Sequence, residues 1–387
     1  MTYSANTTFY QYSDFEDTGL YIGESGKMLL SPGKRLKNVY DLLYTPENLI
    51  ESAHKAVAGK EDKSEVQAFK EDFLENLDNL WEMFGNETFE PGPYTECTIY
   101  EPKERKLLIA PFFPDRIVHQ CIINVLSEHW LHIYTENTYA CIKGRGIHKC
   151  KNDVGKALKN DKKGTRYCLK TDISKFYDNV DHGCLKGIIR YTIADNRLLR
   201  LLDKIIDSNG KSKGLPIGNY TSQYFANLYL AYFDHYVMEI LAPLVWKLFH
   251  VKLYYFRYMD DMVFLCESKE ALFYILDMAG LYLATELKLE FKHNWQVFPT
   301  DDRSIDFVGY VQNHYNCLLR KTILTKMYRK SLIIGKATPI KDENDIKHNF
   351  SSEYGWIIGC SEIHRDRIFN TLIENGSKCF NGGVALN

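Results

Sequence analysis

Residues 257–265 read RYMDDMVFL and place two adjacent acids within an apolar stretch. Apolar runs lie on both sides of the two acids, over 253–258 and 262–266, and each has the length and composition of a β-strand. The pattern predicts a hairpin with Asp260 and Asp261 at its tip. Asp-Asp in a hairpin is usually a solvated turn, but two buried flanking strands favour acids that bind a ligand.

A third acid stands at the end of another predicted strand. Residues 166–173 (RYCLKTDI) have the pattern of a buried strand that ends near Asp172. Carboxylates at the ends of neighbouring strands can converge on one point, where they repel each other unless a cation neutralises them. Such oxygen ligands suit Mg²⁺, and two ions roughly 3.5–4 Å apart stabilise both oxygens of a phosphoryl displacement. The three acids therefore indicate a metal-dependent phosphoryl-transfer site.

The rest of the chain mixes helices with short strands. Hydrophobic spacing predicts helices over 66–84, 116–129 (with Asp115 as N-cap), 218–241 and 269–285. Strand-like segments occupy 94–109 and several short stretches after residue 285. Helices combined with a small antiparallel sheet indicate the α+β class. A length of 387 residues predicts two or three subdomains.

The bulk composition is that of a folded protein, with 45% hydrophobic and 25% charged residues. The first 15 residues lack the pattern of a signal peptide, and the longest apolar stretch, 241–249, is interrupted by Lys247 and is too short to span a bilayer. The ten cysteines include no C-x-x-C pair, so reduced thiols are expected rather than disulfides or a zinc site. These features predict a cytoplasmic protein without membrane contact.

The net charge of −2 is unusual for a protein that binds nucleic acid, because phosphates favour a basic surface. The charge is unevenly distributed, however. Residues 61–90 hold ten acidic and two basic side chains, residues 141–170 hold ten Lys and Arg against two acids, and residues 318–336 hold six against none. Such segregation can place a basic cleft within a neutral total, although solvated helix faces would give the same pattern.

Six motifs, in order, resemble those of the reverse transcriptase family. They are EPKERKLLIAPFFPDRIVHQ (101–120), YACIKGRGIHKC (139–150), LKTDISKFYDNVDH (169–182), GLPIGNYTSQYFANLYL (214–230), RYMDDMVFL (257–265) and FVGY (307–310). The resemblance covers about residues 45–335. It implies a right-hand polymerase with fingers, palm and thumb, acting as an RNA-directed DNA polymerase that adds dNTPs to a primer 3′-OH.

The resemblance assigns catalytic roles by position. Asp172, Asp260 and the backbone carbonyl of Ile173 would hold two Mg²⁺ ions, which Mn²⁺ could replace, and Asp261 would complete the carboxylate cluster. Tyr177 occupies the family's steric-gate position, where its ring would lie in the place of a ribose 2′-OH and favour dNTPs. A simple core aromatic stays the alternative for Tyr177.

Other positions imply contacts with the nucleotide. Met259 would lie against the primer end or the incoming nucleotide. Lys106 stands where relatives usually carry an Arg that holds the triphosphate, and a Lys offers a point charge instead of a fork. Arg116 would contact phosphate or template, or pair with an acid and cap its own helix. Lys292 could protonate the leaving pyrophosphate, on a looser alignment.

Template or primer contacts are expected from Arg145, Lys149 and Gln223, since Gly144 and Gly146 allow a nucleic-acid backbone to approach Arg145 and Lys149 closely. Two further acids, Asp178 and Asp181, are predicted to be turn and cap residues rather than metal ligands.

Within the family, Ile217-Gly218 and Ser222-Gln223 resemble the reverse transcriptases of diversity-generating retroelements. Ile217 replaces a side chain that in relatives hydrogen-bonds near the nucleotide and template, which implies reduced fidelity; simple packing is the alternative. The predicted role is error-prone cDNA synthesis for such a retroelement. The alternatives are an anti-phage defence reverse transcriptase working with a noncoding RNA, and a catalytically silent RNA-binding scaffold, which the three intact acids disfavour.

The predicted divisions are an N-terminal extension (1–45), N-terminal helices and fingers (46–165), a palm (166–315) that includes the helix 218–241, and a thumb (316–387). Too few residues follow the thumb for an RNase H or endonuclease domain. The expected partners are template RNA, a DNA primer, dNTPs and a small basic accessory protein or noncoding RNA. The acidic helix 64–84 is a docking face for such a protein or an ordinary solvated surface.

Overall fold

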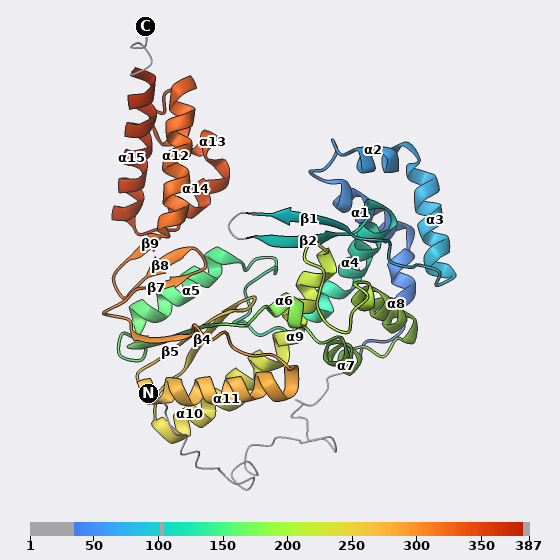
Figure 1. Ribbon diagram of the computed structural model, residues 1–387, viewed down its shortest axis with the longest axis horizontal. Helices are drawn as coiled ribbons and strands as arrows, with labels where there is room; N and C mark the ends of the chain where they lie inside the picture. Colours follow the sequence, from blue (N-terminus) through green and yellow to red (C-terminus); the bar gives the residue numbers. More distant parts are fainter. Residues whose placement is uncertain (1–34, 101–103, 382–387) are drawn as a thin grey trace. The chain divides into compact units, whose positions relative to one another are not determined.

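The computed structural model describes residues 35–100 and 104–381, which fold into two compact units (Figure 1). The first contains residues up to Thr135, Ser174–Leu241 and Ala279–Glu290, and the second contains Glu136–Ile173, Ala242–Met278 and the chain from Phe291. The predicted fingers, palm and thumb divisions do not follow these units and stay predictions. Residues 1–34 of the predicted N-terminal extension lie outside the described residues.

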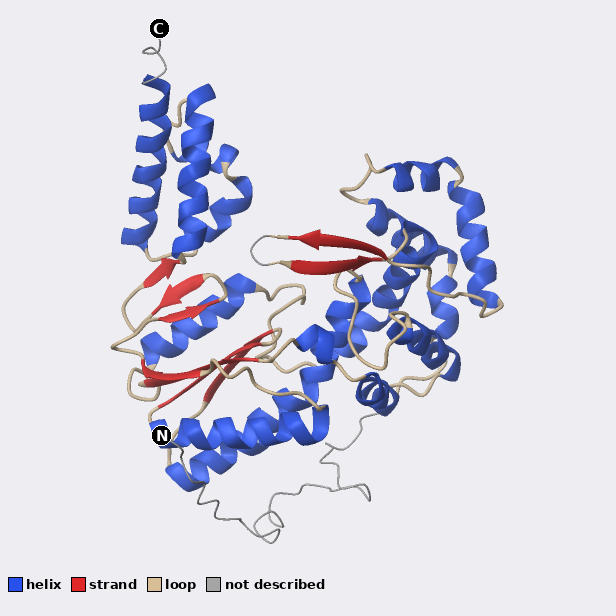
Figure 2. Cartoon of the chain, in the orientation of Figure 1, coloured by secondary structure: helices blue, strands red, loops and turns tan. Residues whose placement is uncertain are grey.

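The first unit is mainly helical (Figure 2). Its helices are η2 (Tyr40–Tyr44), α1 (Pro46–Val57), α2 (Ser64–Glu71), α3 (Phe73–Gly85), η3 (Phe112–Arg116), α4 (Ile117–Leu131), α6 (Phe176–Asn179), α7 (His182–Thr192), α8 (Asn196–Asp207), α9 (Tyr220–His235) and η4 (Tyr236–Leu241). Its described strands, β1 (Thr95–Ile99) and β2 (Arg105–Ile109), form one antiparallel hairpin. Helix α11 (Lys269–Leu287) contributes residues to both units.

The core of the first unit forms where α4 packs against α9. Both helices carry apolar side chains on most of their surface, which is typical of helices buried on several sides. Trp130 of α4 is fully buried and its ring lies 5.9 Å from that of Phe225 on α9. The predicted helix 218–241 corresponds to α9 continued by the π-helix η4, and it begins two residues later because Gly218 has φ +125°.

Two predictions in this unit are corrected. The helix expected over 66–84 is two helices, because Asp72 leaves the helical conformation (φ −110°, ψ 37°) between α2 and α3. Asp115 does not cap the following helix, whose N-cap is Arg116. The Asp115 side chain is buried instead, and it accepts a hydrogen bond from the Gly92 backbone N–H at 2.9 Å. The Asp115 carboxylate therefore binds a distant backbone N–H and not an N–H at the start of its own helix.

The second unit contains the larger sheet. Its strands are β3 (Tyr167–Asp172), β4 (Tyr254–Tyr258), β5 (Asp261–Cys266) and β6 (Gln296–Pro299), in the antiparallel order β4-β5-β3-β6, and β7 (Ile305–Phe307), β8 (Tyr310–Gln312) and β9 (Cys317–Leu319) form a second sheet. Its helices are α5 (Ile147–Asn160), α10 (Ala242–Phe249), α12 (Lys321–Ala337), α13 (Glu343–Asn349), α14 (Ser351–Ile358) and α15 (Glu362–Asn381). The predicted α+β class is therefore confirmed.

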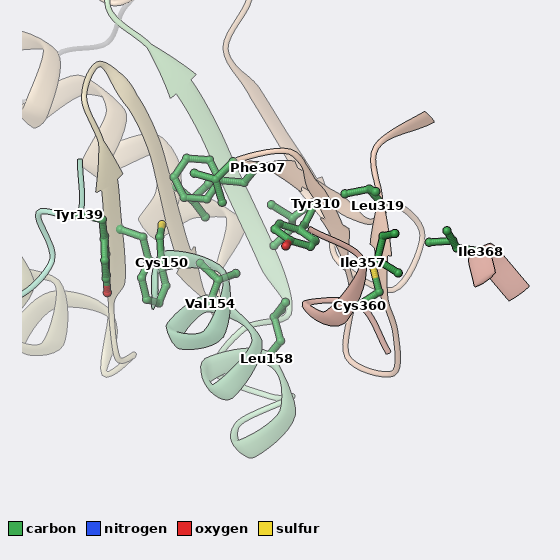
Figure 3. Packing of buried hydrophobic residues seen from close by; sticks show 14 of the residues in the cluster. Tyr139, Cys150, Val154, Leu158, Phe307, Tyr310, Leu319, Ile357, Cys360 and Ile368 are labelled. Atoms are coloured by element: carbon green, nitrogen blue, oxygen red, sulfur yellow. The ribbon is translucent and has the colours of Figure 1, made fainter. Parts of the chain in front are cut away.

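One hydrophobic cluster joins the elements of this unit. Phe256 and Val263 of the sheet belong to the same cluster as Val154 of α5, Tyr310 of β8 and Ile357 of α14. Figure 3 shows the last three of these side chains within the cluster. β5 is buried at every residue from Met262 to Cys266, so the sheet is covered on both faces, and α5 and the second sheet belong to the cluster on one of them. The cluster includes Cys168 of β3 and Val263 of β5, so it packs against the two strands that carry Asp172 and Asp261. None of the helices within the described ranges is long and apolar enough to cross a membrane.

Gly335 and Gly376 allow α12 and α15 to pack closely. A Cβ at Gly335 would stand 2.6 Å from the Gly376 Cα and closer still to its carbonyl oxygen, so the two backbones would have to separate. We expect Gly335→Ala to lower the free energy of unfolding by roughly 1–3 kcal/mol through overpacking, in spite of the better helix propensity of alanine. Urea denaturation measures the change.

The matched control is Gly187→Ala on α7, since a Cβ there meets no atom within 4 Å. This variant should be neutral or slightly stabilising. If both alanine variants unfold at the wild-type urea concentration, the close helix packing is not a source of stability.

Candidate active site

The predicted YMDD hairpin is present, and it brings one of its acids beside Asp172. β4 and β5 pair antiparallel with Tyr258 opposite Asp261, and β3 pairs with β5 with Asp172 opposite Asp261. Residues that lie directly opposite in an antiparallel pair project from the same face of the sheet. Asp172 and Asp261 therefore share a face, and Asp260 stands in the turn that joins β4 to β5.

A buried arginine supports this turn. Arg257 is fully buried, and its Nη1 donates a hydrogen bond to the carbonyl oxygen of Met259 at 3.0 Å. Met259 has φ +55°, a conformation that costs free energy for a residue other than glycine. The Arg257 Nη2 also donates to Thr138 Oγ1 at 3.4 Å. The guanidinium thus holds the strained residue that precedes Asp260.

Burial and mutual repulsion disfavour the charged forms of Asp260 and Asp261. Burial, a hydrogen bond with Asp172 and the charges of Asp172 and Asp261 raise the pKa of Asp260 to about 7. Burial also raises the pKa of Asp261, which the Asp172 charge raises further and Lys170 lowers. The raised pKa of Asp260 means that this buried carboxyl group is held towards its neutral form by the negative charges around it.

Cationic groups lie beside the acids. The Lys292 Nζ stands 3.7 Å from Asp172 Oδ2, and its backbone N–H donates to the Asp172 carbonyl oxygen at 2.8 Å. Lys170 projects from the same face as Asp172 and donates to the carbonyl oxygen of Asp306, whose carboxylate pairs with Arg320 at 2.6 Å. Lys292 and Lys170 therefore offset part of the negative charge of the acids.

The donor set fits a hard divalent cation. Asp172 Oδ1 is buried and has no hydrogen-bond partner among the described residues, which leaves a carboxylate oxygen available as a ligand. Ile173 is buried directly after this acid and supplies a backbone carbonyl. Within 35–100 and 104–381, no three His, Cys, Asp or Glu side chains already converge as a metal cage. A bound cation would offset the repulsion that raises the pKa of Asp260.

Five predicted residues belong to the first unit. Tyr177 is half-buried just after the short helix α6 begins, and its carbonyl oxygen accepts from the Leu215 N–H at 2.8 Å. Ile217 is half-buried, and its carbonyl oxygen accepts from the Leu108 N–H of β2 at 2.9 Å. Lys106 on β2 and Gln223 on α9 are exposed. The segment 214–218 is thus bonded both to the backbone of Tyr177 and to the β1–β2 hairpin.

Arg116, the fifth of these residues, makes two contacts. Its Nε donates to the Ala110 carbonyl oxygen at 3.0 Å and its Nη1 pairs with Glu65 of α2 at 3.1 Å. It therefore pairs with an acid, as one alternative held, but the acid belongs to another helix. Asp181 caps α7 by accepting from the Cys184 N–H at 2.9 Å, as predicted.

Arg145 and Lys149 belong to the second unit. The Arg145 Nη1 donates to the Thr138 carbonyl oxygen at 2.8 Å, and Lys149 pairs with Asp153 at 2.7 Å. Gly144 and Gly146 have φ +79° and +88°, and a Cβ at either would meet nothing within 4 Å. Both glycines are therefore needed for the path of the loop and leave open space beside it.

Sequence patterns gave no role to Arg257, Lys170 or Arg320, which lie next to the cluster or its turn. The one available signal was an arginine inside the apolar run YYFRYM, since a buried charge in a strand requires partners. Lys170 and Arg320 could not be found in this way, because their link to the acids depends on strand register and on Asp306.

Comparisons with known proteins give the same assignment as the motifs. The model of the family described as "Reverse transcriptase (RNA-dependent DNA polymerase)" matches residues 102–311, more than half of the chain. The group II intron-encoded protein LtrA of Lactococcus lactis subsp. cremoris is 23% identical over 176 residues, covering 43% of this chain and 29% of LtrA. Protein YkfC of Escherichia coli (strain K12) is 25% identical over 227 residues, covering 54% of this chain and 59% of YkfC.

This chain spans less than a third of LtrA and about three fifths of YkfC. Among solved structures, the apo telomerase from Candida tropicalis has a TM-score of 0.44 and 13% identity, covering 76% of this chain and 65% of that one. Telomerase from Candida albicans, in complex with a fragment of telomeric RNA, has a TM-score of 0.44 and 11% identity, covering 78% and 65%.

The α+β fold and the family match agree with the predicted right-hand polymerase class. The matched residues include Asp172, Asp260 and Asp261, together with the strands that carry them. This chain belongs to the reverse transcriptase family.

Proposed function

We propose that this protein is an RNA-directed DNA polymerase that adds dNTPs to a primer 3′-OH, with Asp172, Asp260 and Asp261 as its catalytic acids. The observation that carries the proposal is the pairing of Asp172 with Asp261 across β3 and β5, together with a buried Asp172 oxygen that has no hydrogen-bond partner among the described residues. Family membership supports the same chemistry.

The proposed metal ligands are the carboxylates of these three acids and the carbonyl oxygen of Ile173. Two Mg²⁺ ions, or Mn²⁺ in their place, would stabilise the attacking and leaving oxygens of the transferred phosphate when bound there. The chain itself positions the carboxylates through the paired strands and through Arg257, which supports the turn before Asp260. Lys292, close to Asp172, offsets part of their charge.

The remaining contacts are proposed from the family motifs. Tyr177 would exclude ribonucleotides and Met259 would touch the primer end or the nucleotide. Lys106 is proposed to bind the triphosphate, which its exposed position on β2 allows, and Arg116 to contact phosphate or template.

Three residues would contact the template or primer: Arg145, Lys149 and Gln223. Gln223 and Lys149 are exposed, and the open space beside Gly144 and Gly146 supports close approach of a nucleic-acid backbone. Residues 316–387 are proposed as the thumb. The cytoplasmic location stays a prediction.

Primer extension tests the function. Purified protein with Mg²⁺, an RNA template, an annealed DNA primer and dNTPs should lengthen the primer, whereas the same reaction with NTPs or with a chelator should not. Extension with NTPs as efficient as with dNTPs would contradict the role of Tyr177. No extension on any RNA template, with Mg²⁺ or Mn²⁺, would contradict the proposed activity itself.

The finer role that we propose is error-prone cDNA synthesis for a diversity-generating retroelement. It is supported by Ile217, whose apolar side chain cannot hydrogen-bond near the nascent base pair. Neighbouring DNA with two near-identical repeats that differ mainly at adenines would support this role. A conserved noncoding RNA in their place would favour anti-phage defence.

Ile217→Gln should lower the misincorporation frequency by roughly tenfold, because a side chain that hydrogen-bonds to the correct pair contributes about 1–1.5 kcal/mol of discrimination. Sequencing of the cDNA products measures the change. Ile217→Leu, which keeps the side chain apolar, is the matched control and should keep the wild-type spectrum. An unchanged spectrum in Ile217→Gln would leave Ile217 as a packing residue.

A small basic accessory protein is proposed to dock on the acidic surface of α2 and α3. Glu71, Asp78 and Glu82 are exposed there, and Leu74 and Trp81 are 74% and 53% exposed between them. Acids around apolar side chains suit a basic partner that also buries apolar surface.

Reversing the charge of Glu71, Asp78 and Glu82 to lysine should weaken binding of the co-expressed accessory protein at least tenfold, because three attractive charge pairs become repulsive. Isothermal titration measures the affinity. The control reverses three exposed acids of the same unit that lie outside this surface, Glu47, Glu51 and Glu290. This control variant should bind the accessory protein with the wild-type affinity. Equal affinities in all proteins would leave the acids of α2 and α3 as a solvated face.

A further inference from the structure

The turn that carries Ile217 and Gly218 is held by backbone hydrogen bonds from several directions. The Gly214 N–H donates to the Val180 carbonyl oxygen and the Leu215 N–H to that of Tyr177, both at 2.8 Å. The Ile217 carbonyl oxygen accepts from Leu108 of β2. Gly218 is exposed, and a Cβ added at this residue would stand only 3.1 Å from the Leu108 carbonyl oxygen. The turn therefore lies directly against the β1–β2 hairpin.

A chain of side-chain hydrogen bonds holds the end of the same turn. Asn219 is 4% exposed, and its Nδ2 donates to the Tyr94 hydroxyl oxygen at 2.7 Å. The Tyr94 hydroxyl lies 2.6 Å from Ser208 Oγ, and Ser208 Oγ donates to the Ile205 carbonyl oxygen at 2.6 Å. Because Ser208 uses its proton on Ile205, Tyr94 must be the donor to Ser208. Each hydroxyl gives one hydrogen bond and accepts one.

The Asn219 side chain forms no other hydrogen bond with the described residues. Its Oδ1 is buried without a partner, so the bond to Tyr94 is its single side-chain hydrogen bond within the described residues. A buried amide with an unmet acceptor is costly, and such groups persist where position matters. Asn219 therefore holds the turn in place at a cost to the stability of the fold.

Tyr94 is itself fixed from the other side. Asp115 accepts a hydrogen bond from the Gly92 N–H at 2.9 Å, two residues before Tyr94. A Cβ at Gly92 would stand 2.8 Å from Pro111 Cγ, so this segment packs closely on the stretch that precedes α4. Asp115, which was expected to be a helix cap, therefore fixes the segment that leads to Tyr94.

We infer that Tyr94 and Asn219 are positioning residues that set where Ile217 and Gly218 lie against the β1–β2 hairpin, and through them how strictly the enzyme selects the incoming nucleotide. This inference rests on the proposed polymerase function. Because Ile217 has no hydrogen-bonding side chain, this turn would act on the base pair through the placement of its backbone. Tyr94 and Asn219 need not touch the nucleotide themselves.

Single-nucleotide incorporation with Tyr94→Phe tests the inference, because this change removes the hydroxyl and keeps the ring. The ratio of kcat/KM for the correct and a mismatched dNTP should fall about fivefold, the scale of one lost hydrogen bond. The KM for the dNTP should rise while kcat stays within about twofold. Asn219→Ala should give the same change, and the double variant no more than either, because both single variants remove the hydrogen bond between Asn219 and Tyr94.

Tyr40→Phe is the matched control, since Tyr40 is buried in the same unit and donates to the Phe84 carbonyl oxygen at 3.1 Å. Tyr40→Phe should lower the melting temperature about as much as Tyr94→Phe does, without changing nucleotide selection. An unchanged ratio in Tyr94→Phe, or an equal change in Tyr40→Phe, overturns the inference.

Amide hydrogen exchange separates this inference from the proposed function, because it needs no activity. Tyr94→Phe should speed exchange at Leu108, whose N–H is bonded to Ile217, and Tyr40→Phe should not. If the wild-type protein fails to extend primers but Leu108 exchange rises only in Tyr94→Phe, the positioning network stands and the polymerase assignment fails. Unchanged exchange overturns the network whatever the activity.

Discussion

Replacing Asp260 with asparagine is expected to abolish primer extension while making the metal-free protein more stable. The neutral amide cannot take part as an anionic metal ligand, and metal stabilisation of the transition state is worth several kcal/mol. A loss of that size reduces the rate on the order of a thousandfold. The amide has nearly the shape of the carboxyl group, so the turn between β4 and β5 is retained.

The gain in stability follows from the pKa of Asp260, which rises from 3.8 to about 7 on folding because of burial and the neighbouring Asp172. Between these two values the folded state holds a proton that the unfolded state has released, so wild-type stability falls as pH rises. A tenfold difference in proton affinity between the two states corresponds to about 1.4 kcal/mol. Asp260→Asn lacks this loss, and the difference should reach about 1–3 kcal/mol above pH 7.

Chemical denaturation at pH 5 and pH 8, in buffer with a chelator, measures the stability of both proteins, and primer extension with Mg²⁺ measures activity. Asp178→Asn is the matched control, because Asp178 is an exposed acid in α6 with the same amide replacement. It should keep both properties. Wild-type extension by Asp260→Asn would remove Asp260 from the catalytic site, and equal denaturation midpoints at pH 8 would contradict the electrostatic argument.

The elements that local pattern encodes were predictable from the sequence. Apolar runs around Asp260 and Asp261 predicted the hairpin, and the strand that ends at Asp172 was confirmed over Tyr167–Asp172. The helix predicted over 269–285 is α11, which continues to Leu287. In each case the hydrophobic period is set by neighbours in sequence, so the pattern alone contains the information.

Features that depend on distant partners were not predictable in this way. Asp115 has the residue type of an N-cap, but its carboxyl group binds the Gly92 N–H, 23 residues earlier. The break at Asp72 divides a continuous apolar period into two helices. Lys170 reaches Asp306, whose carboxylate also binds Arg320. Periodicity describes which face of an element is buried, and it carries no information about which distant group meets that face.

Arg257 shows what such a distant contact contributes to the site, and its replacement by methionine should have the second largest effect. Methionine fills much of the same volume but removes the hydrogen bonds that Arg257 donates to the carbonyl oxygen of Met259 and to the hydroxyl of Thr138. The loss of a hydrogen bond to a charged donor costs about 1–3 kcal/mol. The free energy of unfolding should therefore fall by roughly 2–4 kcal/mol.

Activity should fall further than this stability loss explains. Met259 would no longer be held at φ +55°, and Asp260 follows it directly. A misplacement of about 1 Å at reacting groups costs on the order of a hundredfold in rate, so primer extension by folded Arg257→Met should drop at least that much. Arg257→Lys should be intermediate, because a lysine keeps the charge but lacks the fork that binds two acceptors.

Leu158→Ala separates the two effects. Leu158 is fully buried on α5 in the hydrophobic cluster of the same unit, and its truncation should cost roughly 2–5 kcal/mol through a cavity. Leu158 lies on α5 and not on the β4–β5 hairpin, so below its melting temperature Leu158→Ala should extend primers at close to the wild-type rate. Were Leu158→Ala as inactive as Arg257→Met at equal stability, the loss would reflect general destabilisation of the unit, and Arg257 would have no specific part in placing Asp260.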